Sequence, residues 1–174
     1  MRKRLTEKYQ EPTEIMGARH FRVKVPADYE LEYSTKNLAV YWKKGLRSDQ
    51  GIIMYTEPLP EEDGVIGDRI IPLRDSLTQL YIPGEKEGSY MKVEDLLPPK
   101  FENRQLDGHF CIETRGLWRT VNDFMGGAFI NYTIFDEVNN QRIMLDGFVY
   151  APELNKRNML LEMEAILQTF ESTN

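Results

Sequence analysis

The chain has 174 residues, of which 41% are hydrophobic and 29% are charged, a composition typical of a globular protein and not of a disordered one. The net charge is −6 and is unevenly distributed, because residues 1–50 carry +4 and residues 51–174 carry −10. An acidic body argues against a broad nucleic-acid surface, one cysteine excludes an intramolecular disulfide, and no apolar run reaches the ~20 residues of a membrane-spanning helix.

The chain begins with a basic segment, Arg2-Lys3-Arg4, that no apolar signal-peptide core follows. Residues 1–20 are predicted to form a helix or an ordered tail, and residues 21–174 a single domain. We therefore expect either a cytoplasmic chain or the mature part of an exported protein.

The first strands are indicated by alternating apolar residues and by turn-forming segments between them. Phe21–Pro26 alternates apolar and charged residues, as a half-buried strand does, and Leu31–Tyr33 and Leu38–Trp42 are the next two short strands. Gly51–Tyr55 is apolar on both faces and is predicted to be a central strand.

The first helix is predicted over Pro72–Leu80. Its proline fits the first turn of a helix, where the missing N–H is no loss. Leu73, Leu77 and Leu80 recur with helical spacing and give the helix one apolar stripe, and Pro83-Gly84 follows its end.

A sheet centre is predicted from the strands that follow. Before it come three segments with strand character: Glu87–Val93, Phe101–Leu106 and His109–Arg115. Ala128–Phe135 and Arg142–Tyr150 then form a hairpin around a polar loop, and the segment Arg115–Trp118 is predicted as a third strand beside them.

The clearest helix is predicted over Glu153–Phe170. Leu160, Met163 and Leu167 recur at spacings of three and four residues, so one face of this helix is expected to pack on the sheet. Strands joined by hairpins with two helices predict an α+β fold, a mostly antiparallel sheet with flanking helices.

Several segments together resemble one known family. They are Arg115-Gly116-Leu117-Trp118, Met125-Gly126-Gly127, Arg74-Asp75-Ser76, Ile82-Pro83-Gly84, Gly88-Ser89-Tyr90-Met91, Val149-Tyr150-Ala151-Pro152 and Lys156-Arg157. With them the chain, from about Phe21 to Phe170, resembles the family known as domain of unknown function 4837 (DUF4837) of Gram-negative bacterial envelopes. One departure is Ala128, where the family pattern implies proline.

The resemblance implies an exported, lipid-anchored parent protein of which this chain is the C-terminal portion, located in the periplasm or on the outer membrane. It implies no catalytic residues, and its implied partner is an unknown protein or small ligand of the cell envelope. The order of strands and helices also resembles the PsbP/Mog-like modules, which are interaction proteins without enzyme activity, although fold alone does not fix function.

Most catalytic and metal-binding arrangements lack their parts. His109 and Cys111 would share one strand face, but a zinc site needs three or four ligands, so no metal is predicted. Gly88-Ser89-Tyr90 lacks the second glycine of a nucleophile elbow, and Gly126-Gly127 is too short for a phosphate loop, so no cofactor is predicted either. The glycine pair instead predicts positive φ at one residue or a bulge.

The best binding candidate is a short segment rich in arginine, methionine and glycine, residue types common at recognition surfaces. It comprises Arg115, Trp118, Arg119, Asp123, Met125, Gly126 and Gly127, and we expect Arg74 to border it. The two arginines would share a strand face and could hold an anionic ligand or a partner's carboxylate.

Two alternatives remain open at this point. The arginines could pair with acids of the chain itself, such as Glu113 or Asp123, and Trp118 could be part of the sheet core. In function, the alternative to a binding module is a hydrolase-type enzyme that uses carboxylates such as Asp75 or Asp123.

Overall fold

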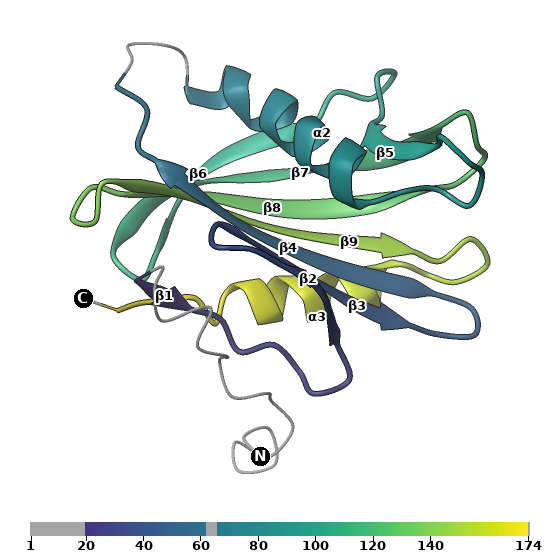
Figure 1. The fold of residues 1–174 in the computed structure, drawn as a ribbon, viewed down its shortest axis with the longest axis horizontal. Coiled ribbons are helices and arrows are strands. Elements are labelled where there is room, and N and C mark those ends of the chain that lie inside the picture. The colour runs from purple at the N-terminus through teal and green to yellow at the C-terminus, as the bar shows by residue number, and fades with distance from the viewer. Residues whose placement is uncertain (1–19, 62–65, 174) are drawn as a thin grey trace.

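The computed structural model describes residues 20–61 and 66–173, so the predicted helix or tail at residues 1–20 lies, except for His20, outside the described residues. An eight-stranded sheet forms the centre of the fold, and its neighbouring strands are antiparallel (Figure 1). Its order is β2-β3-β4-β9-β8-β7, with β5 and β6 both paired to β7. The strands are β2 (Glu30–Ser34), β3 (Leu38–Lys44), β4 (Asp49–Pro58), β5 (Tyr90–Val93), β6 (Lys100–Leu106), β7 (His109–Val121), β8 (Gly126–Asp136) and β9 (Gln141–Tyr150).

This sheet confirms the predicted α+β class and the predicted central hairpins. β8 lies between β7 and β9, and β4 follows β9 in the sheet. The segment Gly51–Tyr55, predicted as a central strand because both its faces are apolar, lies in β4 and has β3 on one side and β9 on the other. The two segments predicted around Arg115 are one continuous strand, β7. β6 pairs with the first part of β7 and β5 with its last part.

The start of the described chain differs in one respect from the prediction of a strand over Phe21–Pro26. Only β1 (Phe21–Arg22) is a strand, and it pairs with β10 (Glu171–Ser172) near the end of the chain. The alternation is nevertheless confirmed, because Phe21, Val23 and Val25 are buried while the residues between them are exposed.

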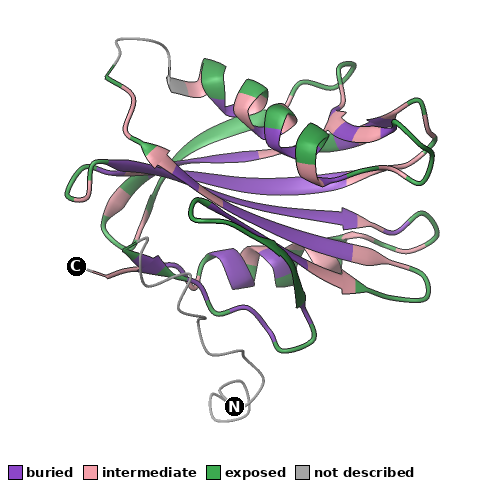
Figure 2. Ribbon diagram, in the orientation of Figure 1, coloured by how far each residue is buried: buried purple, intermediate pink, exposed green. Residues whose placement is uncertain are grey.

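The two helices cover opposite faces of the sheet (Figure 1). α3 (Arg157–Leu167) packs on one face, and the short η2 (Ile66–Arg69) leads into α2 (Ile70–Tyr81) on the other. Each helix closes its own apolar core, and Figure 2 shows the buried strands between the two helices. Alternate side chains of one strand therefore belong to different cores, as the strand period of two requires.

The predicted packing of the last helix is confirmed for Met163 and Leu167, which are fully buried. Ile166 is the third buried side chain, whereas Leu160 is only half-buried. The helix lies close to β9, because a Cβ on Gly147 would come within 2.0 Å of the Met163 Cγ atom. A glycine in the middle of β9 thus lets the helix approach the sheet.

The buried face of α2 is not the predicted leucine stripe. Leu77 is buried, but Leu73 is half-buried and Leu80 is 72% exposed. Ile70 and Arg74 occupy the buried positions instead. The prediction was wrong because it assumed that an arginine would face solvent, whereas Arg74 is paired inside the core.

Candidate functional site

The candidate binding residues come from neighbouring positions of β7 and the turn after it, but the sheet separates them. Arg115 and Arg119 share one face of β7, as predicted, and this is the face that α3 covers, whereas Trp118 points to the α2 face. The segment is therefore not one surface patch, and each residue has its own surroundings.

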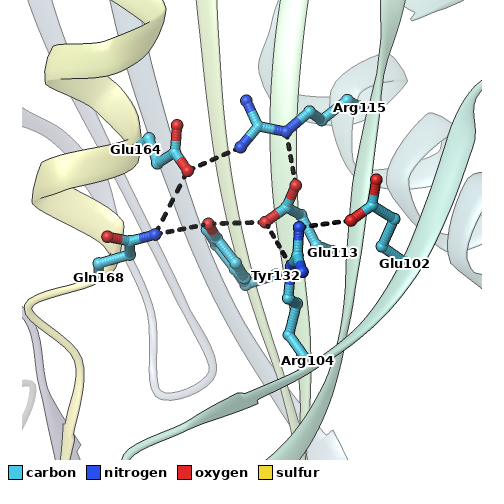
Figure 3. Close-up of polar contacts among 7 residues, drawn as sticks. All are labelled: Glu102, Arg104, Glu113, Arg115, Tyr132, Glu164 and Gln168. Atoms are coloured by element: carbon cyan, nitrogen blue, oxygen red, sulfur yellow. Dashed lines mark hydrogen bonds and ion pairs between the residues drawn. The ribbon is translucent and has the colours of Figure 1, made fainter.

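Arg115 is held by two carboxylates in a network of polar side chains between the sheet and α3 (Figure 3). Its Nε donates to Oε1 of Glu113 at 2.5 Å, and its Nη2 donates to Oε1 of Glu164 on α3 at 2.7 Å. Arg115 thus joins strand β7 to the helix, and the predicted alternative of pairing with Glu113 is confirmed. The side chain of Arg115 is still 42% exposed.

Glu113 is the buried centre of this network, with side-chain exposure of only 5%. Its Oε2 accepts a hydrogen bond from the Tyr132 hydroxyl at 3.1 Å and a longer one from the Arg104 Nε at 3.4 Å. The Tyr132 hydroxyl in turn accepts a hydrogen bond from Gln168 Nε2 at 3.1 Å. Both oxygens of the carboxylate therefore have at least one donor, as a buried charge requires.

The network shifts the pKa values of both central groups. Burial acts to raise the pKa of Glu113, but the hydrogen bond and charge of Arg115, together with the hydrogen bond from Tyr132 and the charge of Arg104, outweigh it and hold this pKa below its ordinary value. Burial acts to lower the pKa of Arg115, and the hydrogen bonds to Glu113 and Glu164 outweigh it and raise this pKa. Both groups stay charged near neutral pH, so Arg115 keeps a fixed position and a full positive charge.

Arg115 lines an open groove of about 610 Å³ that runs along the start of α3. The connection from β9 and the first turns of α3 form the rest of its wall: Leu154, Asn155, Lys156, Arg157, Leu160 and Leu161. Three cations and three leucines therefore line one groove. Its volume lies within the range of ligand sites in proteins.

Trp118 belongs to the core on the α2 face and is 3% exposed, which confirms the predicted alternative for this residue. Together with Trp42, Phe148, Tyr150 and Met125 it lines a cavity of about 30 Å³, enough for one or two water molecules. The indole N–H of Trp118 has no hydrogen-bond partner among the described residues. This aromatic cavity is too small for a ligand larger than a single small group.

Arg119 and Asp123 both bind groups of the chain itself. Arg119 donates from Nη2 to Asp95 at 2.8 Å, and its Nε lies 3.7 Å from Glu94. The Asp123 carboxylate accepts backbone hydrogen bonds from Phe124 at 2.8 Å and from two residues of the loop after α2. The hydrogen bond from the Phe124 amide, together with those from that loop, lowers the pKa of Asp123.

Arg74 lies inside the core on the α2 face and has no exposed surface. Its Nε donates to Oδ2 of Asp146 at 2.7 Å, and its Nη2 donates to Oδ1 of the same carboxylate at 3.1 Å. Asn131 adds a third hydrogen bond to Asp146 at 2.9 Å, and the guanidinium stacks 3.9 Å from the ring centre of Phe129. Arg74 therefore ties α2 to the middle of the sheet, away from the groove.

The prediction of positive φ in the glycine pair is wrong, because neither Gly126 nor Gly127 lies in the left-handed region. Close packing explains Gly127 instead. A Cβ there would lie 1.9 Å from the carbonyl oxygen of Val149 and 2.8 Å from the indole nitrogen of Trp118. Only glycine fits between β9 and the tryptophan ring.

His109 and Cys111 share the α3 face of β7, as predicted, but Cys111 is enclosed in the core and His109 packs its ring against Phe170. Within residues 20–61 and 66–173, no three His, Cys, Asp or Glu side chains are grouped so that they could hold a metal ion. In that same part of the chain, no helix is long and apolar enough to cross a membrane.

The sequence did not single out the residues that form most of the groove. From the sequence, Lys156 and Arg157 are only part of a family-like segment, and Leu160 is predicted to lie in the sheet-facing stripe. The available signal was a pair of adjacent cations at the start of a helix, Lys156 at its N-cap and Arg157 as its first residue, with no acidic residue in the first turn.

Comparisons with known proteins agree with this fold. The chain is similar to the Ran-binding protein Mog1p of Saccharomyces cerevisiae, with 11% identity, a TM-score of 0.58, and coverage of 96% of this chain and 97% of that one. It is also similar to the PsbP protein (CyanoP) of the cyanobacterium Synechocystis sp. PCC 6803, with 12% identity, a TM-score of 0.52, and coverage of 95% and 92%. Both confirm the predicted PsbP/Mog-like fold, and none of the curated proteins compared with the chain matches it. Residues 8–169 match the family described as domain of unknown function (DUF4837), and the chain therefore belongs to that family.

Proposed function

We propose that this chain is a non-catalytic binding module of the bacterial cell envelope that holds its partner in the groove beside α3. The observation that carries the proposal is the groove itself, in which Arg115, Lys156 and Arg157 stand beside three leucines on a chain of net charge −6. Cations and apolar side chains around one open cavity suit recognition of an anionic group with an apolar neighbour.

The arrangement of Arg115 supports binding at this place. Glu113 and Glu164 fix two of its nitrogens, so the guanidinium does not have to be ordered when a partner arrives. Less side-chain entropy is then lost on association, which increases affinity. The name of the similar yeast protein says that it binds Ran, so the same fold serves binding there.

The alternative, a hydrolase-type enzyme that uses Asp75 or Asp123, has less support. Asp75 accepts a hydrogen bond from the Val93 amide at 2.8 Å, and burial raises its pKa, but it lines neither the groove nor the aromatic cavity. Asp123 is occupied by three backbone amides. Each carboxylate stabilises a local backbone segment, which is a sufficient reason for its presence.

The envelope location rests on the family resemblance, which implies a lipid-anchored parent protein. In this proposal the parent's lipoprotein signal provides the membrane attachment, and the partner is a protein or a small ligand of the envelope, not a nucleic acid. Fractionation of cells that produce the tagged full-length parent tests this location. Recovery in the cytoplasmic fraction would contradict it.

Binding is tested in the same full-length parent by cross-linking and co-purification of its neighbours. A variant with Lys156→Ala and Arg157→Ala should lose the captured partner, because both cations line the groove. Arg119→Ala is the control, since it removes a half-buried arginine from the same face of β7 as Arg115 but outside the groove. Equal capture by all three proteins would place the binding surface elsewhere.

A further inference from the structure

Among the described residues, three positive charges without an ion pair lie in or beside one groove. Lys100, Lys156 and Arg157 form no ion pair with a carboxylate of the described residues, whereas most other lysines and arginines of those residues do. Lys156 and Arg157 line the groove, and Lys100 lies directly opposite Arg115 in the pairing of β6 with β7. Cross-strand neighbours point to the same face, so Lys100 adds its charge to the same side.

Arg115 also has hydrogen-bonding capacity left. Its contacts with Glu113 and Glu164 use Nε and Nη2, and Figure 3 shows Nη1 pointing away from both carboxylates. A further anionic group can therefore approach this nitrogen without displacing either glutamate. Hydrogen bonds from a guanidinium to a carboxylate are among the stronger ones in proteins.

The apolar part of the wall indicates what else the occupant carries. Leu161 is 52% exposed, and Leu154 and Leu160 are half-buried, so the three present apolar surface beside the cations. The volume of about 610 Å³ is far larger than a single anion needs. The groove therefore suits a chain segment in which carboxylates and apolar side chains follow one another.

The charges around the groove decide between a protein segment and a membrane surface. Glu153 precedes the groove-lining segment of residues 154–161 in sequence, Glu162 and Glu164 follow it on α3, and residues 51–174 carry a net charge of −10. A broad anionic bilayer would face these acids as well as the cations, and repulsion would oppose its approach. A narrow segment can instead contact Lys156 and Arg157, which pair with no carboxylate of the described residues, without covering the rest of this acidic surface.

We infer that the groove binds an acidic segment of a partner protein, in which glutamate or aspartate side chains alternate with leucine-like ones. This inference rests on the proposed function and names the chemistry of its partner. The carboxylates contact Arg115, Lys156 and Arg157, and the apolar side chains pack on Leu160 and Leu161.

The test uses the full chain and a fluorescently labelled short peptide of alternating glutamate and leucine, followed by anisotropy at low and high salt. A matched peptide with glutamine in place of glutamate should bind at least roughly tenfold more weakly. Binding of the glutamate peptide should also fall as salt is raised, because ions screen exposed charges.

A pair of charge-reversed variants locates the site. Lys156→Glu with Arg157→Glu should weaken the glutamate peptide roughly tenfold or more. The control, Lys24→Glu with Lys44→Glu, makes the same change in net charge at exposed lysines outside the groove. It should bind the glutamate peptide almost as tightly as the unsubstituted chain does. Circular dichroism and unfolding midpoints show that both variants are folded.

Three results would overturn the inference: equal affinity for the glutamine peptide, equal effects of the two variants, or binding to phosphatidylglycerol vesicles with no binding of the peptide. The proposed function can be judged separately. If the peptide does not bind but the Lys156→Ala, Arg157→Ala parent still loses its envelope partner, the acidic-segment inference fails and the binding module stands. If capture is also unchanged, both fail at this groove.

Discussion

The ion pair of Arg74 with Asp146 should be the most sensitive polar contact of the fold. Both side chains are 0% exposed and are joined by hydrogen bonds of 2.7 and 3.1 Å. Arg74→Met leaves the carboxylate buried with only Asn131 as a side-chain donor, so we expect a loss of about 3–5 kcal/mol in the free energy of unfolding. Asp146→Leu leaves the guanidinium unpaired and should cost a similar amount.

The double variant separates the pair from the rest of the core. Arg74→Met with Asp146→Leu buries no unpaired charge, and only Asn131 loses a hydrogen-bond acceptor, at a cost of about 1–3 kcal/mol. The sum of the two single losses should therefore exceed the loss of the double variant by at least about 3 kcal/mol.

Urea unfolding followed by circular dichroism gives the free energy of unfolding of the unsubstituted chain, the two single variants and the double variant. Arg22→Met is the control, because Arg22 makes a similar contact to Glu171 at 2.6 Å, but with side chains 54% and 39% exposed. It should cost less than about 1 kcal/mol. If Arg74→Met costs no more than Arg22→Met, burial does not determine the strength of these pairs and the reasoning is refuted.

Three further predictions concern the α3 face. Met163→Ala should cost about 2–5 kcal/mol in unfolding experiments, and Leu160→Ala clearly less, because only Met163 is fully buried; equal losses would contradict the packing. The pKa of Glu113 is lowered in the folded chain, so Glu113 contributes stability that is present above its unfolded pKa of about 4.3 and is lost as the pH falls through its folded pKa. The unsubstituted chain should therefore lose more stability than Glu113→Gln on acidification. Parallel profiles of unfolding free energy against pH for the two proteins would exclude this. Burial raises the pKa of Cys111 to about 11, so a thiol reagent should label it at neutral pH only after unfolding, and rapid native labelling would show that it is accessible.

The sheet was predictable because its strands are marked locally. The alternation in Ala128–Phe135 and Arg142–Tyr150, with a polar loop between them, places β8 and β9 within one or two residues of their observed ends. Hairpins need only neighbouring segments, so the antiparallel class followed. The pairing of β5 with the last part of β7 did not, because these two segments are separated in the chain by β6 and the first part of β7.

The buried position of Arg74 could not be read from helical periodicity. Its partner Asp146 is 72 residues away and stands alone among the apolar residues of β9. A single carboxylate in a strand that is otherwise buried was the available signal, because such a charge needs a buried partner. The sequence does not say which cation supplies it.

The candidate site was predicted in part. Arg115 was identified, and it lines the groove, but its neighbours in sequence do not. Strand geometry sends alternate residues to opposite faces, so Trp118 enters the other core. The cations that line the groove with Arg115 are Lys156 and Arg157. They come from a segment that only the folded α3 brings to β7.

The pairing of β4 with β9 has a consequence for how the chain folds. β4 ends at Pro58 and its second neighbour begins only at Gln141, so one edge of this apolar strand has no partner until most of the chain has been made. Ile52, Ile53 and Met54 have no exposed surface in the folded protein, and all three would face water or other chains during this interval. Pairings between distant segments form slowly and leave intermediates prone to aggregation. We therefore expect the sheet to close late in synthesis or after it, with β9 as the strand that joins the early half of the chain to the late half.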